Sequence, residues 1–111
     1  KQKNIELYVG IQPSLFFKKI KTDDEEKNFN ILINKYGYSY FLYYKSAYPK
    51  MLDGLKLLEK KYPNDIKILN TNNTFDNEKI DIFRDNVHFL DYANKIVAEK
   101  IFKSLNFKNE N

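Results

Sequence analysis

The sequence contains no cysteine and no tryptophan, and its 111 residues include one histidine, three glycines and three prolines. Without cysteine, the chain can form no disulfide framework, no thiolate metal site and no cysteine nucleophile. A single histidine also excludes metal sites built from several imidazoles. No apolar run approaches the roughly 20 residues that a membrane-spanning helix needs, so we expect no membrane segment in this chain. The length allows one small domain at most, and nothing in the composition calls for a cofactor.

What the sequence does contain is aromatic surface, because nine Tyr and nine Phe make up 16% of the residues. Disordered chains lack that much apolar surface, so the composition predicts a folded domain. Six of the nine Tyr lie between Tyr36 and Tyr48, in a stretch whose pattern fits a strand or a helix. These side chains could pack in the core, or they could form a surface that contacts carbohydrate or acyl groups.

The charge is only mildly unbalanced, at +4 from 19 basic and 15 acidic residues, which does not by itself imply nucleic acid. A basic and aromatic stretch at residues 16–21 is followed by four acidic residues at 23–26 that cancel its charge. We therefore expect a solvated loop there and no nucleic-acid partner. The acidic residues between Asp76 and Asp91 lack the spacing and the closing Glu of a calcium loop, so we expect no metal site.

Two short apolar segments predict strands. Residues 5–11 have one polar side chain in seven and end at Gln12-Pro13, which is typical of a strand buried on both faces. Residues 66–69 predict a second strand. Helical segments separate the two, so a crossover would place them parallel in one sheet. Because two strands are too few for a stable sheet, we expect something else to cover the free edge of the first strand.

Capping signals predict the helices. Thr22 and Glu25 have the spacing of a capping box, which predicts a helix over about 23–36, with Gly37 as the residue that ends it. Pro49 suits the first turn of a second helix.

The last helix follows Asp91, the expected N-cap. Its apolar stripe is formed by Ala93, Ile96, Val97, Ile101, Phe102 and Leu105. The order of strand, helices, strand, loop and helix predicts an α/β fold built on a βαβα unit.

The most informative segment is the loop that precedes the last helix, where the only histidine, His88, stands three residues after Asp85. An imidazole can take up a proton near neutral pH and return it, and a carboxylate on its other nitrogen fixes the tautomer. Three-residue spacing in a tight turn brings the two side chains to the same side. Spacing alone is weak support for catalysis, because a histidine in a loop is more often an ordinary surface residue.

The run from Asp85 to Leu105 resembles the last conserved block of the SGNH/GDSL hydrolase family, in which Asp-x-x-His is followed by a helix. Asp85 and His88 match that pair, and Leu90-Asp91 match the apolar and N-capping positions that follow it. Many relatives have Gly where this sequence has Ala93. The two predicted strands are also similar to the preceding part of the family's sheet, so the resemblance covers nearly the whole chain.

No nucleophile is identifiable. The family uses a Ser in a Gly-Asp-Ser-like turn, with oxyanion donors from that Ser, a Gly and an Asn. None of the four serines, which are Ser14, Ser39, Ser46 and Ser104, stands in a Gly-Asp-Ser or Gly-x-Ser-x-Gly context. Ser14 follows Pro13 at a strand end, where a turn or helix-start hydroxyl is the simpler interpretation. A His–Asp pair alone keeps only a base, so we expect the isolated chain to be inactive.

The resemblance therefore implies that residues 1–107 are the C-terminal part of one SGNH hydrolase-like domain, a three-layer α/β/α flavodoxin-like fold with a parallel sheet, and that 108–111 are a polar tail. It implies a serine esterase in which His88 is the base, Asp85 orients it, and the N-terminal half of the same protein supplies the Ser. The implied substrate is an ester or an O-acylated carbohydrate or lipid. Many relatives are exported or associated with the cell envelope, and the compartment of this protein stays open.

A second hypothesis is a non-catalytic α/β binding or interaction module that uses the Tyr-rich region 36–48, with His88 as a surface residue. The two hypotheses differ in what they require upstream. A Gly-Asp-Ser-type turn and a Gly-x-Asn segment ahead of Lys1 would support the hydrolase.

Overall fold

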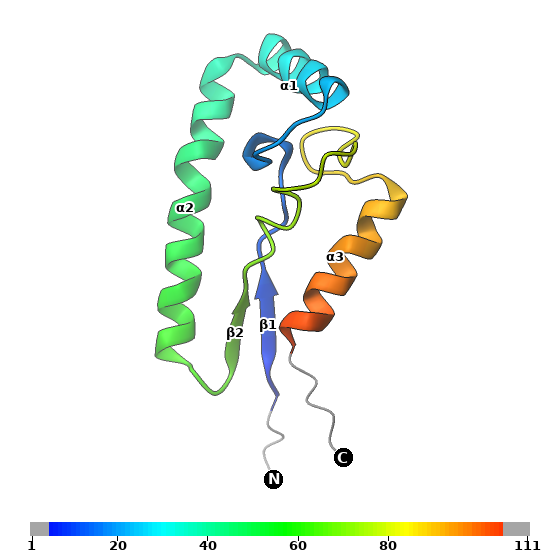
Figure 1. The fold of residues 1–111 in the computed structure, drawn as a ribbon. Coiled ribbons are helices and arrows are strands. Elements are labelled where there is room, and N and C mark those ends of the chain that lie inside the picture. Colours follow the sequence, from blue (N-terminus) through cyan, green and yellow to red (C-terminus); the bar gives the residue numbers. More distant parts are fainter. Residues whose placement is uncertain (1–4, 106–111) are drawn as a thin grey trace.

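The computed structural model describes residues 5–105 as a mixed α/β chain in the order β-α-α-β-α, with a short 3-10 turn, η1, after the first strand (Figure 1). The elements are β1 (Leu7–Gly10), η1 (Leu15–Phe17), α1 (Asp23–Tyr36), α2 (Tyr38–Lys61), β2 (Ile66–Leu69) and α3 (Asp91–Ser104). This confirms the predicted order. The tail expected at 108–111 lies outside the described residues.

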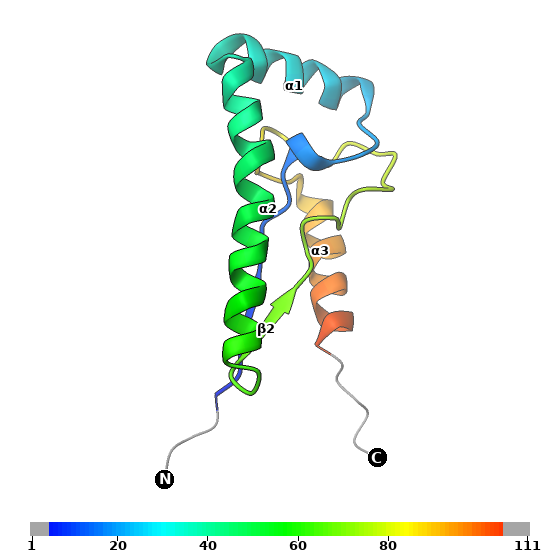
Figure 2. The same ribbon diagram turned by 90° about the vertical axis from the view of Figure 1, so that its left-hand side faces the viewer.

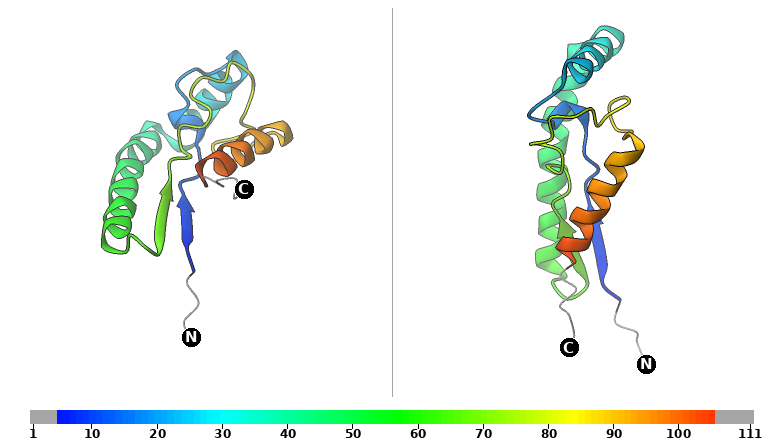
Figure 3. Two further views of the ribbon diagram at one scale, coloured as in Figure 1. Left: turned by 60° about the horizontal axis from the view of Figure 1, so that its bottom comes forward. Right: turned by 45° about the vertical axis from the view of Figure 1, so that its right-hand side comes forward.

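The two strands pair in parallel, with Leu7 opposite Ile66 and Gly10 opposite Leu69. The predicted parallel arrangement is confirmed. Helix α2 lies on one side of the strands and α3 on the other, and α1 crosses above them (Figures 1 and 3). Gly10 allows a close approach, because a Cβ atom there would lie 2.7 Å from Oγ1 of Thr71. That hydroxyl donates a hydrogen bond to the carbonyl oxygen of Ile11 at 2.7 Å.

Helix α1 has the predicted bounds because its capping signals act locally. Oγ1 of Thr22 accepts from the Glu25 amide at 3.2 Å, and Oε1 of Glu25 accepts from the Thr22 amide at 3.3 Å. Gly37 ends the helix with φ of 85°, a conformation that favours glycine. The capping box and the glycine stop are thereby confirmed.

The predicted start of the second helix is wrong. Helix α2 begins at Tyr38 and carries Pro49 in its interior, although proline lacks the amide that the helical hydrogen bond needs. Packing explains the difference, because the side chains of Tyr40, Tyr44 and Tyr48 repeat every fourth residue. The ring of Tyr44 lies 5.2 Å from that of Phe16, centroid to centroid. This aromatic face extends the helix across the stretch that the sequence left ambiguous.

Helix α3 begins at Asp91 itself, so Asp91 is its first residue and not the predicted N-cap. Leu90 occupies the N-cap position and makes no side-chain cap hydrogen bond. The Asp91 carboxylate instead lies 3.8 Å from the Arg84 guanidinium.

The expectation that the first strand is buried is also wrong within the described residues. β1 is shorter than predicted, and it is exposed: Leu7 keeps 55% of its surface accessible and Ile5, just before the strand, keeps 74%. The cause is the two-stranded sheet, in which β2 is the only paired neighbour of β1 among residues 5–105. An apolar groove of about 430 Å³ also separates the strands from α3.

The hydrophobic core lies around η1 and the segment that precedes α3. In Figure 2 these two segments lie above the strands, on the side of α1. The buried members of the core are Leu15, Phe75, Ile82, Phe83 and Ala93, with Phe29, Leu32, Phe89, Ile96 and Val97 packed around them. This core supports the loop that carries Asp85 and His88. No helix in the described part of the chain is both long and apolar enough to cross a bilayer.

Candidate active site

The Asp85–His88 segment is a closed loop held at its base. An isolated antiparallel bridge joins Phe83 to Phe89, and the Leu90 amide donates to the Ile82 carbonyl at 2.7 Å. Inside this bridge, the Arg84 amide donates to the His88 carbonyl at 2.9 Å. The rings of Phe75, Phe83 and Phe89 pack edge to face, with centroids 5.1–5.6 Å apart. Aromatic packing therefore sets the direction in which the loop leaves the core.

Asp85 uses both carboxylate oxygens within the loop. Its Oδ1 accepts from the amides of Val87 at 2.9 Å and His88 at 2.8 Å. Its Oδ2 lies 2.8 Å from Nδ1 of the His88 ring, as the three-residue spacing predicted. The backbone hydrogen bonds hold the carboxylate in place, and the second oxygen is left for the imidazole.

The electrostatics of the loop favour a charged Asp85. Partial burial raises the pKa of this carboxyl group, but the amides of His88 and Val87 and the His88 ring lower it by more. The pKa of Asp85 therefore lies below its ordinary value, and the group is ionised at neutral pH. An ionised carboxylate only accepts hydrogen bonds, so Nδ1 must be the donor and the neutral ring carries its lone pair on Nε2.

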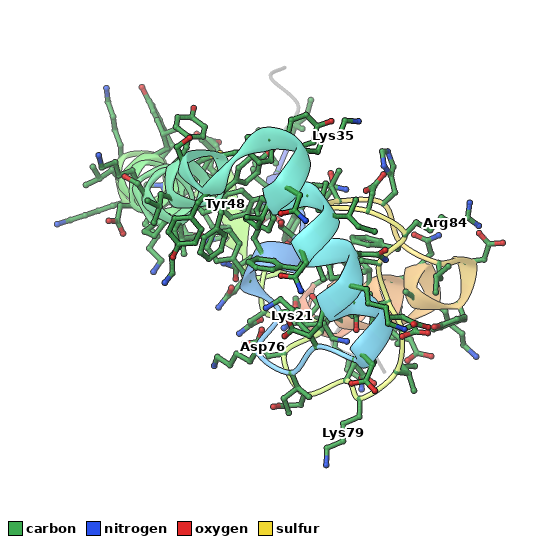
Figure 4. All side chains as sticks on the ribbon, turned by 90° about the horizontal axis from the view of Figure 1, so that it is seen from above. Lys21, Lys35, Tyr48, Asp76, Lys79 and Arg84 are labelled. Carbon is green, nitrogen blue, oxygen red and sulfur yellow. The ribbon has the colours of Figure 1, made fainter. Side chains whose placement is uncertain are left out.

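The His88 ring is accessible to a substrate, since 74% of its side chain is exposed. It lines an open hollow of about 520 Å³ together with Gln12, Arg84, Asp85, Val87, Phe89, Asp91 and Asn94. Seen from above, Arg84 lies beside the first turn of α3 and Tyr48 lies across the molecule on α2 (Figure 4). The arrangement gives a base with an oriented ring and open space beside it.

The loop is tied to the segment that follows β1, a connection that sequence reasoning missed. Nε2 of Gln12 donates to the Val87 carbonyl at 2.7 Å, and the Leu15 amide donates to the Asn86 carbonyl at 2.8 Å. Oγ of Ser14 donates to Oδ1 of Asn86 at 2.6 Å. In the two side-chain hydrogen bonds, the partners are 72 and 75 residues apart in the sequence, so no local pattern could have paired them.

The serines do not complete the pair. Ser14 is buried, and its Oγ accepts from the Phe16 amide while donating to Asn86, so it is a turn hydroxyl as the simpler interpretation held. Ser39 and Ser46 are exposed on α2, and Oγ of Ser104 donates to a carbonyl within α3. None of these four serines hydrogen-bonds to His88 within residues 5–105. The described residues thus bring Asp85 and His88 together, with no serine hydroxyl hydrogen-bonded to the ring.

The predicted solvated loop at 16–21 is wrong for Lys18, which is buried. Its ammonium pairs with the Glu25 carboxylate, which is also buried, and donates to the Ile80 carbonyl at 2.9 Å. Tertiary packing brings this pair together, because η1 and the first turn of α1 fold against the loop at Ile80. Across residues 5–105, no group of three or more acidic or histidine side chains could hold a metal ion.

The Tyr-rich region divides between packing and surface. Tyr48 stacks on Phe17 with ring centroids 4.6 Å apart and donates to the Gln12 carbonyl at 3.1 Å. Tyr38 and Tyr43 are exposed on the same helix. Tyr48 therefore supports the segment at Gln12, which in turn holds the loop between Phe83 and Phe89 that carries the Asp85–His88 dyad, called here the dyad loop.

Comparison with known proteins finds no similar family, because no family model, curated protein or solved structure matches the chain.

Proposed function

We propose that this chain is the C-terminal part of an SGNH/GDSL-like serine esterase and supplies its base and orienting acid. The observation that carries the proposal is the 2.8 Å contact between Oδ2 of Asp85 and Nδ1 of His88, on an exposed ring beside an open hollow. The parallel α/β arrangement is compatible with a portion of a three-layer α/β/α, flavodoxin-like fold. The substrate class is an ester or an O-acylated carbohydrate or lipid.

Each residue has a defined role in this reaction. Nε2 of His88 takes the proton from a serine hydroxyl as its oxygen attacks the ester carbonyl, and then returns that proton to the leaving alcohol. Asp85 keeps the ring in the Nδ1–H tautomer and stabilises the imidazolium that forms. An acyl-enzyme results, and water activated by the same base clears it. The serine and the oxyanion donors come from the N-terminal half of the protein.

Uncovered apolar surface supports the need for that half. β1 is unpaired along one edge within residues 5–105, its side chains are largely exposed, and the groove of about 430 Å³ runs beside it. Leu57 on α2 is also exposed. Surfaces of this kind mark sites that another segment covers. We assign that role to the preceding part of the same polypeptide.

The test is hydrolysis of a short-chain aryl ester by the complete gene product. His88→Ala should lower kcat by about 10²–10⁴-fold, the usual contribution of a general base, and Asp85→Asn should lower it by a smaller factor. The melting temperature of His88→Ala should hardly change, because 74% of that side chain is exposed. That of Asp85→Asn should fall only slightly, by the loss of the carboxylate that accepts from two loop amides. Asp53→Asn, an exposed acid on α2, is the matched control.

Residues 1–111 alone should be inactive in the same assay. Activity retained after His88→Ala in the complete protein would contradict the assignment. So would esterase activity of the 111-residue chain, if that activity remains after His88→Ala.

A binding module is the second candidate, and the exposure of Tyr38 and Tyr43 on α2 favours it. In that case Tyr43→Ala should weaken carbohydrate or acyl-ligand binding measured by calorimetry, while His88→Ala should leave it unchanged. The esterase proposal instead expects His88→Ala to lower kcat and Tyr43→Ala to leave kcat unchanged.

A further inference from the structure

Asn86 lies between Asp85 and His88 in the sequence. Its side chain is buried, although both of its neighbours along the chain are more exposed. Its backbone carbonyl accepts from the Leu15 amide at 2.8 Å, and its side-chain Oδ1 accepts from Oγ of Ser14 at 2.6 Å.

The donors and acceptors agree around this residue. Oγ of Ser14 accepts from the Phe16 amide, so its proton is free to go to Oδ1 of Asn86. One side chain thus connects the dyad loop to the segment after β1.

The contact between Asp85 and His88 is itself exposed to water. The His88 side chain is 74% exposed and that of Asp85 is 49% exposed. Exposed pairs of this kind contribute little, because water competes for both partners. A buried hydrogen bond in the same loop is not subject to that competition, and an orphaned buried partner is strongly disfavoured.

We propose that the buried Ser14–Asn86 pair positions the Asp85–His88 dyad, holding the loop so that Oδ2 of Asp85 stays against Nδ1 of His88. The catalytic meaning of this anchor rests on the proposed esterase function, whereas the structural effect on His88 does not. Ser14 and Asn86 are positioning residues that contact neither substrate nor the reacting atoms.

The single histidine makes the test direct, because one imidazole gives one set of ring ¹⁵N resonances in the 111-residue chain. The ¹⁵N shifts report which ring nitrogen carries the proton when the ring is neutral. The unaltered chain should show the Nδ1–H tautomer. Ser14→Ala and Asn86→Ala should both move it toward a mixture of tautomers, because the carboxylate no longer fixes the ring.

Thr71→Val is the matched control, since it removes a buried hydroxyl that bonds the Ile11 carbonyl and does not contact the dyad loop. It should leave the tautomer unchanged. If Asn86→Ala fails to fold, Ser14→Ala decides the question alone. The unaltered tautomer in Ser14→Ala, or an equal change in Thr71→Val, would overturn the proposal.

In the complete enzyme, Ser14→Ala should lower kcat by about 10–100-fold with KM unchanged, as expected for a misplaced base. The two proposals fail separately. A change of tautomer in a protein without His88-dependent esterase activity would retain the anchor and remove the esterase. His88-dependent activity with an unchanged tautomer would retain the esterase and remove the anchor.

Discussion

The end of the molecule that carries the dyad and the end that carries the strands differ in how fully they are packed. The dyad end comprises η1, α1 and residues 75–93, and it holds a core in which Leu15 and Ile82 have no accessible surface. The strand end comprises β1, β2 and the C-terminal half of α2. There Leu57 on α2 is 67% exposed, and Leu7 on β1 is also mostly accessible.

The difference indicates which part of the proposed site the chain can form without help. The loop that orients His88 rests on aromatic packing and buried hydrogen bonds that all come from described residues. The strand end lacks cover for its apolar groups, and burial of such groups contributes about 25 cal/mol per Å². The contacts that orient His88 therefore come from within this chain, whereas the apolar side chains of the strand end stay exposed.

The largest expected effect contrasts one apolar residue from each end, buried at the dyad end and exposed at the strand end. Phe83→Ala should lower the free energy of unfolding by about 3–5 kcal/mol, because it leaves a cavity under the dyad loop. Leu7→Ala in the same 111-residue chain should change it by less than about 0.5 kcal/mol, since exposed positions contribute little. Urea denaturation followed by circular dichroism measures both. Equal losses would remove the distinction between the two ends.

The buried ion pair of the dyad end should be nearly as sensitive. Lys18→Met strands the Glu25 carboxylate without its partner and should lower the free energy of unfolding by about 3 kcal/mol or more. Lys27→Met is the control. Nζ of Lys27 lies 3.3 Å from Oδ1 of Asp24, and both side chains are exposed, so this pair should contribute about 0–1 kcal/mol. Denaturant titration of both variants tests this, and a Lys18→Met chain as stable as the control would show that the pair is solvated.

The helix cap of the dyad end should have a smaller effect. Thr22→Ala removes the cap of α1 and the hydrogen bond that its hydroxyl donates to Asp81, so it should cost about 1–2 kcal/mol. Ser39→Ala, an exposed hydroxyl at the start of α2, should cost little. Thermal unfolding ranks the two variants, and a reversed order would contradict the structure.

The smallest expected effect is a pH dependence that Asp85 adds. The folded-state pKa of Asp85 is below its ordinary value, so the charged form stabilises the fold above about pH 4, the ordinary value for Asp. That contribution is lost as the pH falls through the folded-state pKa. Asp85→Asn should therefore be less stable than the parent at pH 7, and the difference should shrink toward pH 3.

Denaturation between pH 3 and 7 measures this difference, with Asp53→Asn as the control. A difference that is the same at both pH values would mean that the Asp85 carboxylate is not stabilised by its loop.

Sequence reasoning succeeded where neighbours along the chain decide the structure. The capping box at Thr22 and Glu25 sets the start of α1, and Gly37 sets its end. The three-residue spacing of Asp85 and His88 anticipated their contact for the same reason. The assignment of that pair to catalysis stays a prediction.

It failed where distant segments decide. Helix α2 begins at Tyr38, ahead of the start predicted at Pro49, because its tyrosines pack on Phe16 and Phe17, and no pattern near Pro49 contains that information. Lys18 is buried because α1 brings Glu25 to it. The apolar composition of residues 5–11 predicts a buried strand, but burial needs a covering segment, and β1 has β2 alone beside it in the described chain.

The sequence by itself determined the short-range features of this protein: α1 with its caps, β2, and an acid three residues from the only histidine. Tertiary structure alone decided that Ser14 hydrogen-bonds to Asn86 and that Lys18 is buried. It also decided that the apolar side chains are buried at the dyad end and exposed at the strand end. The physical reason is range. Capping and turn hydrogen bonds form between close neighbours, whereas burial depends on which remote surfaces the folded chain brings together.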